Sequence, residues 1–260
     1  MKRILITGAG TGFGRETAIT LAKRGHHVYA ATYDQHQSEA LADYADLKGV
    51  NLDILKIDIT DINDIKKAKN LDVDVLINNA AIGESGALVE IPIDRVRNNL
   101  ETNVLGTLSM IQAVTPKMMK RKNGTIIMVT SLAGRVPLPF LSPYSMSKYA
   151  LESAGAGLAE ELKPFNIHVS MIEPGPYSTG FNEANMNKKY NWMKEDSLYR
   201  DKIDYIKKTE NRLILRMQKS NFTPVIKAMV KAAESNKPKL RYAVPKWMGL
   251  GVNLLRGFGV

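Results

Sequence analysis

Strand-like and helix-like segments alternate along most of this 260-residue chain, and the alternation limits the possible folds more than any other feature. Short runs rich in β-branched and apolar residues occupy 3–8, 27–32, 52–58, 73–80, 125–131 and 167–175. Apolar residues recur every three or four positions in 14–25, 61–70, 93–122 and 143–164, which predicts helices there. Strand and helix in strict succession require parallel strands joined by right-handed crossovers. The sequence therefore predicts an α/β fold with a doubly wound parallel sheet and helices on both faces.

The remainder of the chain departs from this rhythm. Polar, charged and large side chains fill about 181–221, and we expect this segment to form a substrate lid or insert. A helix at 223–238 and a strand at 240–245 follow, and four glycines in the apolar tail 245–260 argue against a firm helix there. The length suits one domain, so we expect a single unit over 1–260.

Composition excludes several classes of protein. The chain contains no cysteine, so it has no disulfide framework and no thiolate metal site, and we expect no metal centre. The basic start is followed by too short an apolar run for a secretion signal. No apolar run reaches the roughly 18 residues of a membrane-spanning helix. A cytoplasmic location is the default expectation.

The net charge of +10 belongs to the C-terminal part of the chain. Residues 186–260 contain 17 Lys and Arg against 6 Asp and Glu. Such a surplus could attract nucleic acid, an anionic membrane or acidic substrates. The basic residues are scattered among acids, without the aromatic interleaving of a base-stacking groove. We therefore interpret them as a solvated surface and expect no nucleic-acid partner.

A glycine-rich turn, TGAGTGFG (7–14), directly follows the first predicted strand and opens a helix. Gly8, Gly12 and Gly14 follow the spacing GxxxGxG, whereas the more widespread GxGxxG would require glycine at Phe13. Missing side chains let backbone N–H groups and a helix N-terminus approach a pyrophosphate. The turn between a strand and a helix thus favours a dinucleotide, and the alternative is a tight turn without a ligand.

The type of dinucleotide should be decided at the end of the second strand. An acid there would hold a ribose 2′-hydroxyl, and a basic residue would accept a 2′-phosphate. The sequence offers Thr32, Tyr33 and Asp34, of which Asp34 lies late. NAD(H) or NADP(H) is therefore expected, with a slight preference for NAD(H) because no Arg or Lys is present to receive the phosphate.

Polar residues also end the third and fourth predicted strands. Asp58 could accept a hydrogen bond from an adenine amino group, or it could cap the helix that begins near Thr60. Asn78 and Asn79 could line the cofactor site or anchor neighbouring strand ends. The sequence leaves both pairs of alternatives open.

Four further polar residues suggest proton chemistry. Tyr144 and Lys148 are four apart in a predicted helix and therefore share one face. A nearby ammonium lowers the pKa of a phenol, which predicts that Tyr144 can act as general acid and base. Lys148 would also hold ribose hydroxyls, and Ser131, at the end of the fifth strand, would stabilise the reacting oxygen. Asn103, in the helix before, could hold a water that relays protons from Lys148.

Each of these residues also has a plain structural interpretation. Tyr-x-x-x-Lys occurs by chance in many helices, Ser131 could be an ordinary loop hydroxyl, and Asn103 could cap or kink a helix. Their joint spacing with the glycine turn is what favours a catalytic site.

At this point the chain resembles the short-chain dehydrogenase/reductase family, of the single-domain Rossmann type. The matching motifs are TGAGTGFG (7–14), Asp58, NNAA (78–81), NVLG (103–106), Ser131, YSMSK (144–148) and EPGPYST (173–179). The resemblance implies a sheet of about seven strands and an NAD(P)-dependent oxidoreductase that interconverts a secondary alcohol and a ketone. Ala81 is a departure, because the family usually has glycine there.

The resemblance also implies site residues. The catalytic set carried over is Asn103, Ser131, Tyr144 and Lys148. The cofactor-binding set is Gly8, Thr11, Gly12, Phe13, Gly14, Thr32, Asp58, Ile59, Asn79, Ala80, Ala81, Tyr144, Lys148, Pro174, Gly175 and Thr179. The segment after the last motif resembles members that act on hydrophobic alcohols such as steroids or retinoids. Residues that could line an apolar pocket, or simply pack, are Leu138, Phe140, Leu141, Tyr177, Phe181, Met186 and Trp192.

The family's oligomers imply that this chain forms a homodimer or homotetramer. The small residues after Lys148, among them Gly155 and Gly157, would let another element lie close to the helix. Two alternative functions remain: a sensor or scaffold that binds cofactor without turnover, and a protein that docks on a membrane through its basic C-terminal third. In the second, Trp247, Leu250, Leu254 and Phe258 would be the anchors.

Overall fold

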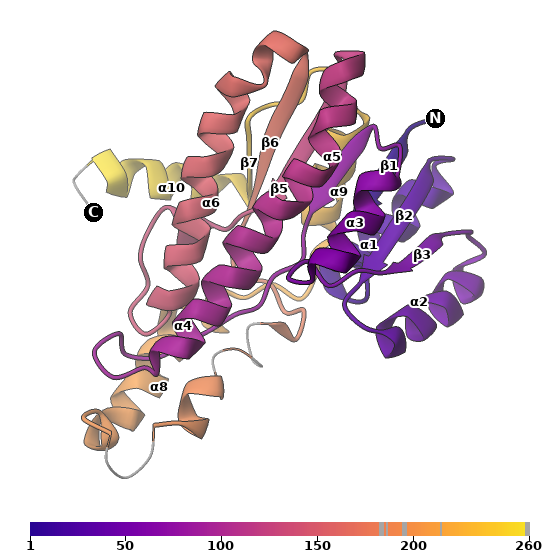
Figure 1. The fold of residues 1–260 in the computed structure, drawn as a ribbon. Coiled ribbons are helices and arrows are strands. Elements are labelled where there is room, and N and C mark those ends of the chain that lie inside the picture. Colours follow the sequence, from indigo (N-terminus) through magenta and orange to yellow (C-terminus); the bar gives the residue numbers. More distant parts are fainter. Residues whose placement is uncertain (182–184, 186, 194–196, 214, 258–260) are drawn as a thin grey trace.

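A seven-stranded parallel sheet forms the centre of the molecule (Figure 1). The computed structural model describes residues 1–257 apart from 182–184, 186, 194–196 and 214. The strands are β1 (Arg3–Ile6), β2 (His27–Thr32), β3 (Asp53–Lys56), β4 (Val75–Asn78), β5 (Gly124–Val129), β6 (Ile167–Pro174) and β7 (Arg241–Val244). They are ordered β3-β2-β1-β4-β5-β6-β7, and every neighbouring pair is parallel. The predicted doubly wound sheet is confirmed.

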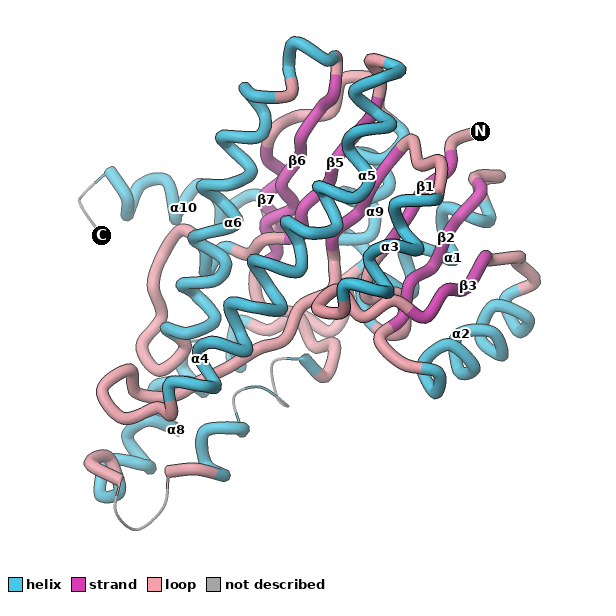
Figure 2. Tube along the Cα trace, in the orientation of Figure 1, coloured by secondary structure: helices cyan, strands magenta, loops and turns pink. Residues whose placement is uncertain are grey.

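Helices cover both faces of the sheet (Figure 2). The α-helices are α1 (Gly12–Lys23), α2 (Gln35–Lys48), α3 (Ile62–Asn70), α4 (Ile93–Leu100), α5 (Thr107–Arg121), α6 (Ser142–Glu161), α8 (Ile203–Leu213), α9 (Thr223–Glu234) and α10 (Lys246–Gly257). The shorter helical turns are η1 (Glu101–Gly106), η2 (Leu132–Gly134), η3 (Lys163–Phe165), η4 (Lys188–Asn191), η5 (Arg200–Lys202) and η6 (Leu215–Met217). In this arrangement α3, α5 and α6 pack on one face of the sheet, and α1 and α9 pack on the other.

Alternation along the strands divides the core into these two layers. In β1, Ile4 and Ile6 point into the layer with α1 and α9, whereas Leu5 points into the layer with α3, α5 and α6. All three side chains are fully buried. A central strand with apolar residues on both faces reads as a continuous hydrophobic run, as RILI does.

The helix α2 is absent from the sequence-based prediction. It has few buried positions, so its apolar periodicity is weak. Its end signals are clear instead: the Asp34 carboxylate accepts a hydrogen bond from Gln37 N at 2.8 Å, and Gly49 ends the helix in the left-handed region at φ 64°.

The expectation that glycines would keep the C-terminal tail from forming a firm helix is wrong, because α10 spans Lys246–Gly257. A Cβ on Gly249 would lie 2.4 Å from Ala243 Cβ. This glycine therefore allows close packing of α10 on β7, which offsets its low helix propensity.

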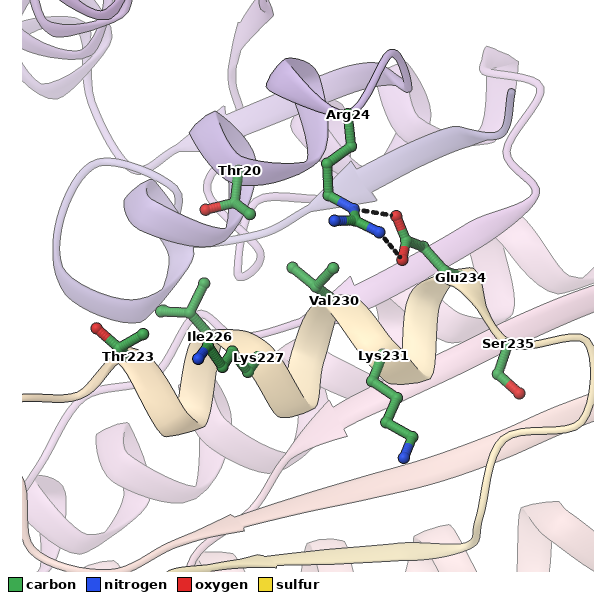
Figure 3. A pocket seen from close by; sticks show the side chains of 9 residues that line it. All are labelled: Thr20, Arg24, Thr223, Ile226, Lys227, Val230, Lys231, Glu234 and Ser235. Carbon is green, nitrogen blue, oxygen red and sulfur yellow. Dashed lines mark hydrogen bonds and ion pairs between the residues drawn. The ribbon is translucent and has the colours of Figure 1, made fainter.

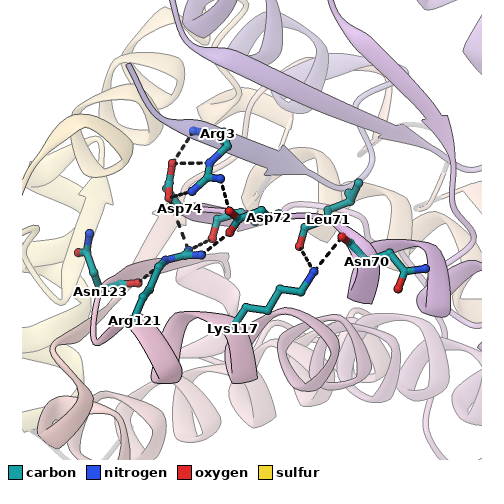
Figure 4. Close-up of polar contacts among 9 residues, drawn as sticks. Arg3, Asn70, Leu71, Asp72, Asp74, Lys117, Arg121 and Asn123 are labelled. Carbon is teal, nitrogen blue, oxygen red and sulfur yellow. Dashed lines mark hydrogen bonds and ion pairs between the residues drawn. The ribbon is translucent and has the colours of Figure 1, made fainter.

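Two ion-pair clusters lie away from the carboxyl ends of the strands, one between the sheet and α5 and one between two helices. Arg3 at the start of β1 pairs with Asp72 and Asp74, and Arg121 at the end of α5 joins the same cluster (Figure 4). On the other face, Arg24 Nη2 and Glu234 Oε2 lie 2.9 Å apart and join α1 to α9 beside a shallow groove (Figure 3). These exposed pairs contribute modestly to stability.

Candidate active site

The carboxyl ends of β1, β4, β5 and β6 lie along one edge of the sheet. Strand order reverses between β1 and β4, which is where open α/β sheets bind ligands. The glycine turn follows β1, Asn79 follows β4, Ser131 follows β5 and Gly175 follows β6. The topology thus collects the predicted residues at a single edge.

The glycine turn closes as tightly as its spacing predicts. Gly8 and Gly12 adopt φ 63° and 54°, a region that other residues rarely occupy. A Cβ on Gly14 would lie 2.2 Å from the Gly8 carbonyl oxygen. Gly10 also has a packing role, because a Cβ there would lie 2.5 Å from Gln37 Oε1.

The start of α1 is suited to an anion. Thr11 is the N-cap residue and makes no side-chain capping bond, so the first N–H groups of this 12-residue helix receive nothing from it. Thr179 lies above the turn, with its Cβ 3.7 Å from the position of a Cβ on Gly12. Phe13 instead packs with Tyr177 and Phe222 at ring-centroid distances of 6.0 and 5.6 Å. Its side chain therefore belongs to the core.

A clamp between β1 and β4 fixes the turn. Thr7 Oγ1 accepts hydrogen bonds from Asn79 N and Ala80 N at 3.0 and 3.1 Å. Asn79 Nδ2 donates to the carbonyl oxygens of Thr7 and Gly8, each at 3.0 Å. Asn79 therefore anchors the strand ends, one of the two roles left open above. Thr7 is absent from the predicted site, although a threonine directly after the strand was the available signal.

Asn78 and Ala81 flank this clamp in the sequence. Asn78 is 4% exposed, and its side-chain oxygen and nitrogen lack hydrogen-bond partners among the described residues. Ala81 is half-buried at the same edge. The closed turn, the uncapped helix start and this unpaired amide together fit a bound dinucleotide.

The end of β2 offers little to discriminate between cofactors. Thr32 is fully buried, and its hydroxyl shares a hydrogen bond of 2.6 Å with Ser38. The Asp34 carboxylate caps α2, so it serves the helix. Tyr33 is 59% exposed and is the side chain of this group most open to solvent.

Asp58 and Ile59 follow β3. Asp58 Oδ1 accepts from Thr60 N and Thr60 Oγ1 at 2.9 and 2.7 Å, which stabilises a turn, while Asp61 is the N-cap of α3. Ile59 is buried, and a Cβ on Gly106 would lie 2.9 Å from it. Contact of either residue with an adenine stays a prediction.

Tyr144, Ser131 and Lys148 meet beside β5. The Ser131 side chain interacts with the Tyr144 phenol. The Lys148 ammonium lies 5.5 Å from the centroid of the Tyr144 ring and donates to the Val129 carbonyl oxygen at 2.9 Å. Ser131 Oγ also accepts from Ala133 N at 3.1 Å, which holds the loop after β5. The predicted grouping of these three side chains is therefore observed.

Burial sets the proton affinities of the pair. It raises the pKa of Tyr144 to about 12, and the hydrogen bond with Ser131 acts in the opposite direction. Burial also lowers the pKa of Lys148 to about 8, against an opposing effect from the charge of Glu152. The predicted lowering of the Tyr144 pKa is therefore wrong in this structure, because removal of the phenol from water is the largest effect on it.

Asn103 lies in η1, a π-helical turn between α4 and α5. The side chain accepts from Ile82 N at 2.8 Å and donates to the Ile82 carbonyl oxygen at 2.8 Å and to Ser147 Oγ at 3.0 Å. Ser147 Oγ in turn donates to the Tyr144 carbonyl oxygen at 2.7 Å. A π-turn interrupts the ordinary helical register and often marks a functional position. These bonds join the loop after β4 to α6, and the proposed water relay stays a prediction.

A buried charge network that the sequence analysis missed supports the same region. Glu173, fully buried at the end of β6, lies 3.1 Å from Arg135 Nη1 and 3.0 Å from Arg241 Nε. Arg241 Nη2 lies 3.0 Å from Glu152 on α6. The pKa of Glu173 is raised, because burial and the nearby Glu152 outweigh the opposing effect of the two arginines. Glu173 directly precedes Pro174 in the matched motif, but nothing in the sequence shows that it pairs with Arg135 and Arg241.

Several of the side chains suggested for an apolar pocket make aromatic or close packing contacts. Phe181 lies 5.8 Å from the Tyr144 ring, and Phe140 lies 5.6 Å from the ring of Tyr199. A Cβ on Gly86 would lie 2.1 Å from Trp192, so this glycine makes room for the indole. Of the other suggested pocket residues, Tyr177 packs in the core and Met186 lies outside the described residues.

Metal and membrane sites can be assessed for the described residues. No group of three His, Asp or Glu side chains there is arranged to hold a metal ion. No helix within this part of the chain has both the length and the apolar character needed to cross a bilayer.

Known proteins share these motifs. A family model described as short chain dehydrogenase matches residues 2–190. A 3-ketodihydrosphingosine reductase of Bacteroides thetaiotaomicron is 36% identical over 186 residues, which cover 69% of this chain and 65% of that protein. Human 17-beta-hydroxysteroid dehydrogenase type 1 is 31% identical over 249 residues, covering 92% of this chain and 76% of that protein. Human retinol dehydrogenase 8 is 33% identical over 187 residues, covering 69% and 60%. The chain thus aligns with less than two thirds of the first and third of these relatives.

Solved structures agree in fold. A short-chain dehydrogenase from Streptomyces avermitilis has a TM-score of 0.78 at 28% identity, covering 99% of this chain and 92% of that one. A member from Burkholderia phymatum, in complex with NAD, has a TM-score of 0.82 at 24% identity over 97% and 92%. One from Sphingobium yanoikuyae, in complex with NADPH, has a TM-score of 0.74 at 22% identity over 99% and 95%. With the motifs, the site geometry and the family match in agreement, this chain belongs to the short-chain dehydrogenase/reductase family and is an oxidoreductase.

Proposed function

We propose that this oxidoreductase interconverts a secondary alcohol and a ketone on a hydrophobic substrate, with NAD(P)(H) as cofactor and Tyr144 as general acid and base. The observation that carries the proposal is the interaction of the Tyr144 phenol with the Ser131 side chain, beside the Lys148 ammonium 5.5 Å from the centroid of the Tyr144 ring. Two neighbouring hydroxyl groups can both form hydrogen bonds with a single substrate oxygen, and the ammonium supplies a fixed positive charge.

The roles of the side chains follow from this geometry. A bound nicotinamide would supply the hydride acceptor or donor. Tyr144 donates its proton to a carbonyl oxygen during reduction, and its raised pKa keeps it protonated at neutral pH. Ser131 donates a hydrogen bond to the same oxygen and stabilises the charge that develops there. Lys148, held by the Val129 carbonyl, favours the phenolate that remains after transfer.

A hydrophobic substrate is supported by two observations. Phe181 packs against Tyr144, so the approach to the phenol is at least partly apolar. The relatives named above include a steroid dehydrogenase, a retinol dehydrogenase and a ketodihydrosphingosine reductase. The segment 181–221 is proposed to complete the substrate side as a lid.

The direct test is a screen of secondary alcohols with NAD⁺ and NADP⁺ supplied separately, on wild type and Tyr144→Phe. Loss of the proton-transferring group should lower kcat by about 10²–10⁴-fold while leaving cofactor affinity close to wild type. Cofactor binding measured by fluorescence separates a chemical defect from a folding defect. Equal turnover by the two proteins would refute the assigned acid and base.

The preference for NAD(H) has its own test at Tyr33. No Lys or Arg occurs from Thr32 to Gln37, so a 2′-phosphate lacks a cationic partner in that stretch. Tyr33→Arg should raise the ratio of kcat/KM for NADP⁺ over NAD⁺ about tenfold, since a hydrogen bond to a charged group is worth about 1.5–3 kcal/mol. Tyr33→Gln is the matched control that removes the ring without adding charge. A wild-type enzyme that already prefers NADP⁺ would contradict the assignment.

A further inference from the structure

Helix α10 presents large apolar side chains to solvent. Trp247, Leu250 and Leu254 are 59%, 65% and 66% exposed. Their spacing of three and four residues places them on one face of the helix. Leu255 beside them is 46% exposed. We name these four residues the α10 stripe, and a contiguous apolar stripe on the outside of a helix is the kind of surface that often marks an interaction site.

The opposite face of α10 fixes the direction of the stripe. Gly249 is buried against Ala243 on β7, and Val252 is buried as well. Asn253 Oδ1 accepts from Arg135 Nη2 at 2.5 Å, which ties the helix to the loop after β5. The helix is therefore held by contacts on its inner side, and turning the stripe inward would break them.

Cations border the α10 stripe. Lys246 is exposed at the first position of the helix. The Lys219 ammonium, also exposed, lies 6.0 Å from the centroid of the Trp247 ring, although the two residues are far apart in sequence. They belong to the part of the chain that carries the whole positive surplus. Apolar residues with a tryptophan and bordering lysines are the composition of a helix that lies in a lipid headgroup layer.

We propose that α10 docks this enzyme on an anionic lipid surface, with the α10 stripe inserted at the headgroup boundary and Lys219 and Lys246 facing the anionic headgroups. Attraction of basic residues to anionic lipid and burial of apolar area both contribute to such binding. The attachment is peripheral, consistent with the lack of a spanning helix among the described residues.

The size of the α10 stripe favours lipid over a protein partner. Four partly exposed side chains on one short helix offer a few hundred Å² at most, since even a whole aromatic side chain buries about 150–250 Å². A stable protein interface buries roughly 800 Å² on each partner. A lipid surface needs no such area, because insertion of a few anchors combined with charge attraction suffices for reversible binding.

The docked helix adjoins the active site. A Cβ on Gly175 would lie 3.0 Å from Met248 Sδ on α10, and Gly175 belongs to the loop after β6. Arg135, which binds Asn253, follows the loop that holds Ser131. Docking would therefore bring the carboxyl edge of the sheet close to the lipid. The proposal does not depend on the substrate or on turnover.

Vesicle sedimentation with the full chain tests the apolar part of the proposal. We expect wild type to bind phosphatidylcholine vesicles that contain phosphatidylglycerol, and to bind pure phosphatidylcholine weakly. The double variant Leu250→Ser and Leu254→Ser should bind at least about tenfold more weakly, because the burial of even one leucine side chain contributes about a factor of ten. Leu47→Ser, at a 77% exposed leucine on α2, is the matched control and should bind like wild type.

Charge and depth are tested separately. Lys219→Gln with Lys246→Gln should weaken binding to the anionic vesicles at low salt and remove most of its salt dependence, whereas Lys69→Gln, an exposed lysine on α3, should not. The chain contains two tryptophans, so a blue shift of emission on anionic vesicles in wild type should be lost in Trp247→Phe. A shift that persists in that variant would contradict insertion of Trp247.

Three outcomes would overturn the proposal. The first is no binding by wild type, and the second is equal vesicle binding by wild type and the double serine variant. The third is a lower mass of the double serine variant in lipid-free sedimentation, which would make the α10 stripe a contact between copies of this chain. Circular dichroism of each variant distinguishes these outcomes from loss of the fold.

Discussion

The ammonium group of Lys148 is buried, which is unfavourable for a charge. The side chain is 3% exposed, and its ammonium has the Val129 carbonyl oxygen as a hydrogen-bond acceptor at 2.9 Å. A carbonyl dipole replaces only part of the hydration of an ammonium, so burial lowers the pKa of Lys148 to about 8. At neutral pH the group remains largely protonated, as its proposed role beside Tyr144 requires. Stability alone would not favour a buried charge at this position.

This cost predicts a pH-dependent difference between wild type and Lys148→Met. Because the folded pKa of about 8 lies below the ordinary 10.5, the unfolded chain binds more protons between these values, and the free energy of unfolding of wild type rises with pH there. The variant lacks this rise. Its stability relative to wild type should therefore fall by about 3 kcal/mol from pH 8 to 10.5, as measured by urea unfolding.

Other effects of the substitution can be separated from the titration. Loss of the hydrogen bond to the Val129 carbonyl changes the stability difference between the two proteins by the same amount at every pH. The slope of that difference against pH is therefore unchanged. Tyr144 titrates in both proteins, so its contribution to the pH dependence of stability largely cancels in the difference. Lys69→Met, at an exposed lysine, is the control and should show no such slope. A constant difference between wild type and Lys148→Met across the window would show that the ammonium is not destabilised by burial.

At the scale of single elements, the π-turn η1 and the helix α6 act together. Asn103 from η1 binds both Ile82 and Ser147, and Ser147 binds the backbone of Tyr144. A Cβ on Gly134 would lie 2.8 Å from the Lys148 backbone, so η2 also packs directly against α6. The position of Tyr144 is therefore set by contacts from two loops, in addition to its place on α6.

The glycines of α10 give a matched pair of predictions. Gly249→Ala would place a Cβ 2.4 Å from Ala243 Cβ and should destabilise the protein by about 1–3 kcal/mol through overpacking. Gly251→Ala meets nothing within 4 Å and should stabilise it by up to about 1 kcal/mol through helix propensity. Thermal unfolding followed by circular dichroism measures both. Similar effects of the two substitutions would contradict the packing of α10 on β7.

At the scale of the whole molecule, hydrogen bonds join the 181–221 segment to a distant part of the sequence. Ser85 Oγ donates to the Asn185 carbonyl oxygen at 2.7 Å, and Glu90 accepts from Ser197 Oγ at 2.7 Å. Within the 181–221 segment, the buried Lys189 and Glu210 form an ion pair between η4 and α8. Breaking such a pair on one side is costly, because it leaves a buried charge unpaired. These contacts hold the described residues of the proposed lid in place.

The expected oligomer is a further prediction at this scale. Gly155 packs within the chain, because a Cβ there would lie 2.6 Å from Met171 Sδ, whereas Gly157 has open space apart from Glu161. On the neighbouring turn η1, Leu105 is 50% exposed. Wild type should sediment as a dimer or tetramer, and Leu105→Glu should yield a smaller species because a charge would enter the interface. Leu47→Glu is the control, and a monomeric wild type would contradict the prediction.

Local patterns in the sequence determined the fold class and most of the site. Alternating strand and helix signals fix a parallel doubly wound sheet, and parallel strands bring their carboxyl ends to one edge whatever the side chains are. The spacing of Gly8, Gly12 and Gly14 predicts the tight turn because the turn is local. Tyr144 and Lys148 are predicted to share a face because helix geometry is local too. The helix α2 was missed where its buried face is too narrow to produce a periodic signal.

Long-range packing decided the rest. The direction of the Tyr144 pKa depends on how completely other segments exclude water from the phenol, which no local pattern encodes. The network of Glu173, Arg135 and Arg241 joins residues more than 30 positions apart, so sequence spacing gives no sign of it. Gly249 reads as a helix breaker in the sequence and proves to be a packing contact once β7 lies beneath it. Local geometry chose the elements and their order, and burial, which requires the whole chain, decided the charge states and contacts of the site.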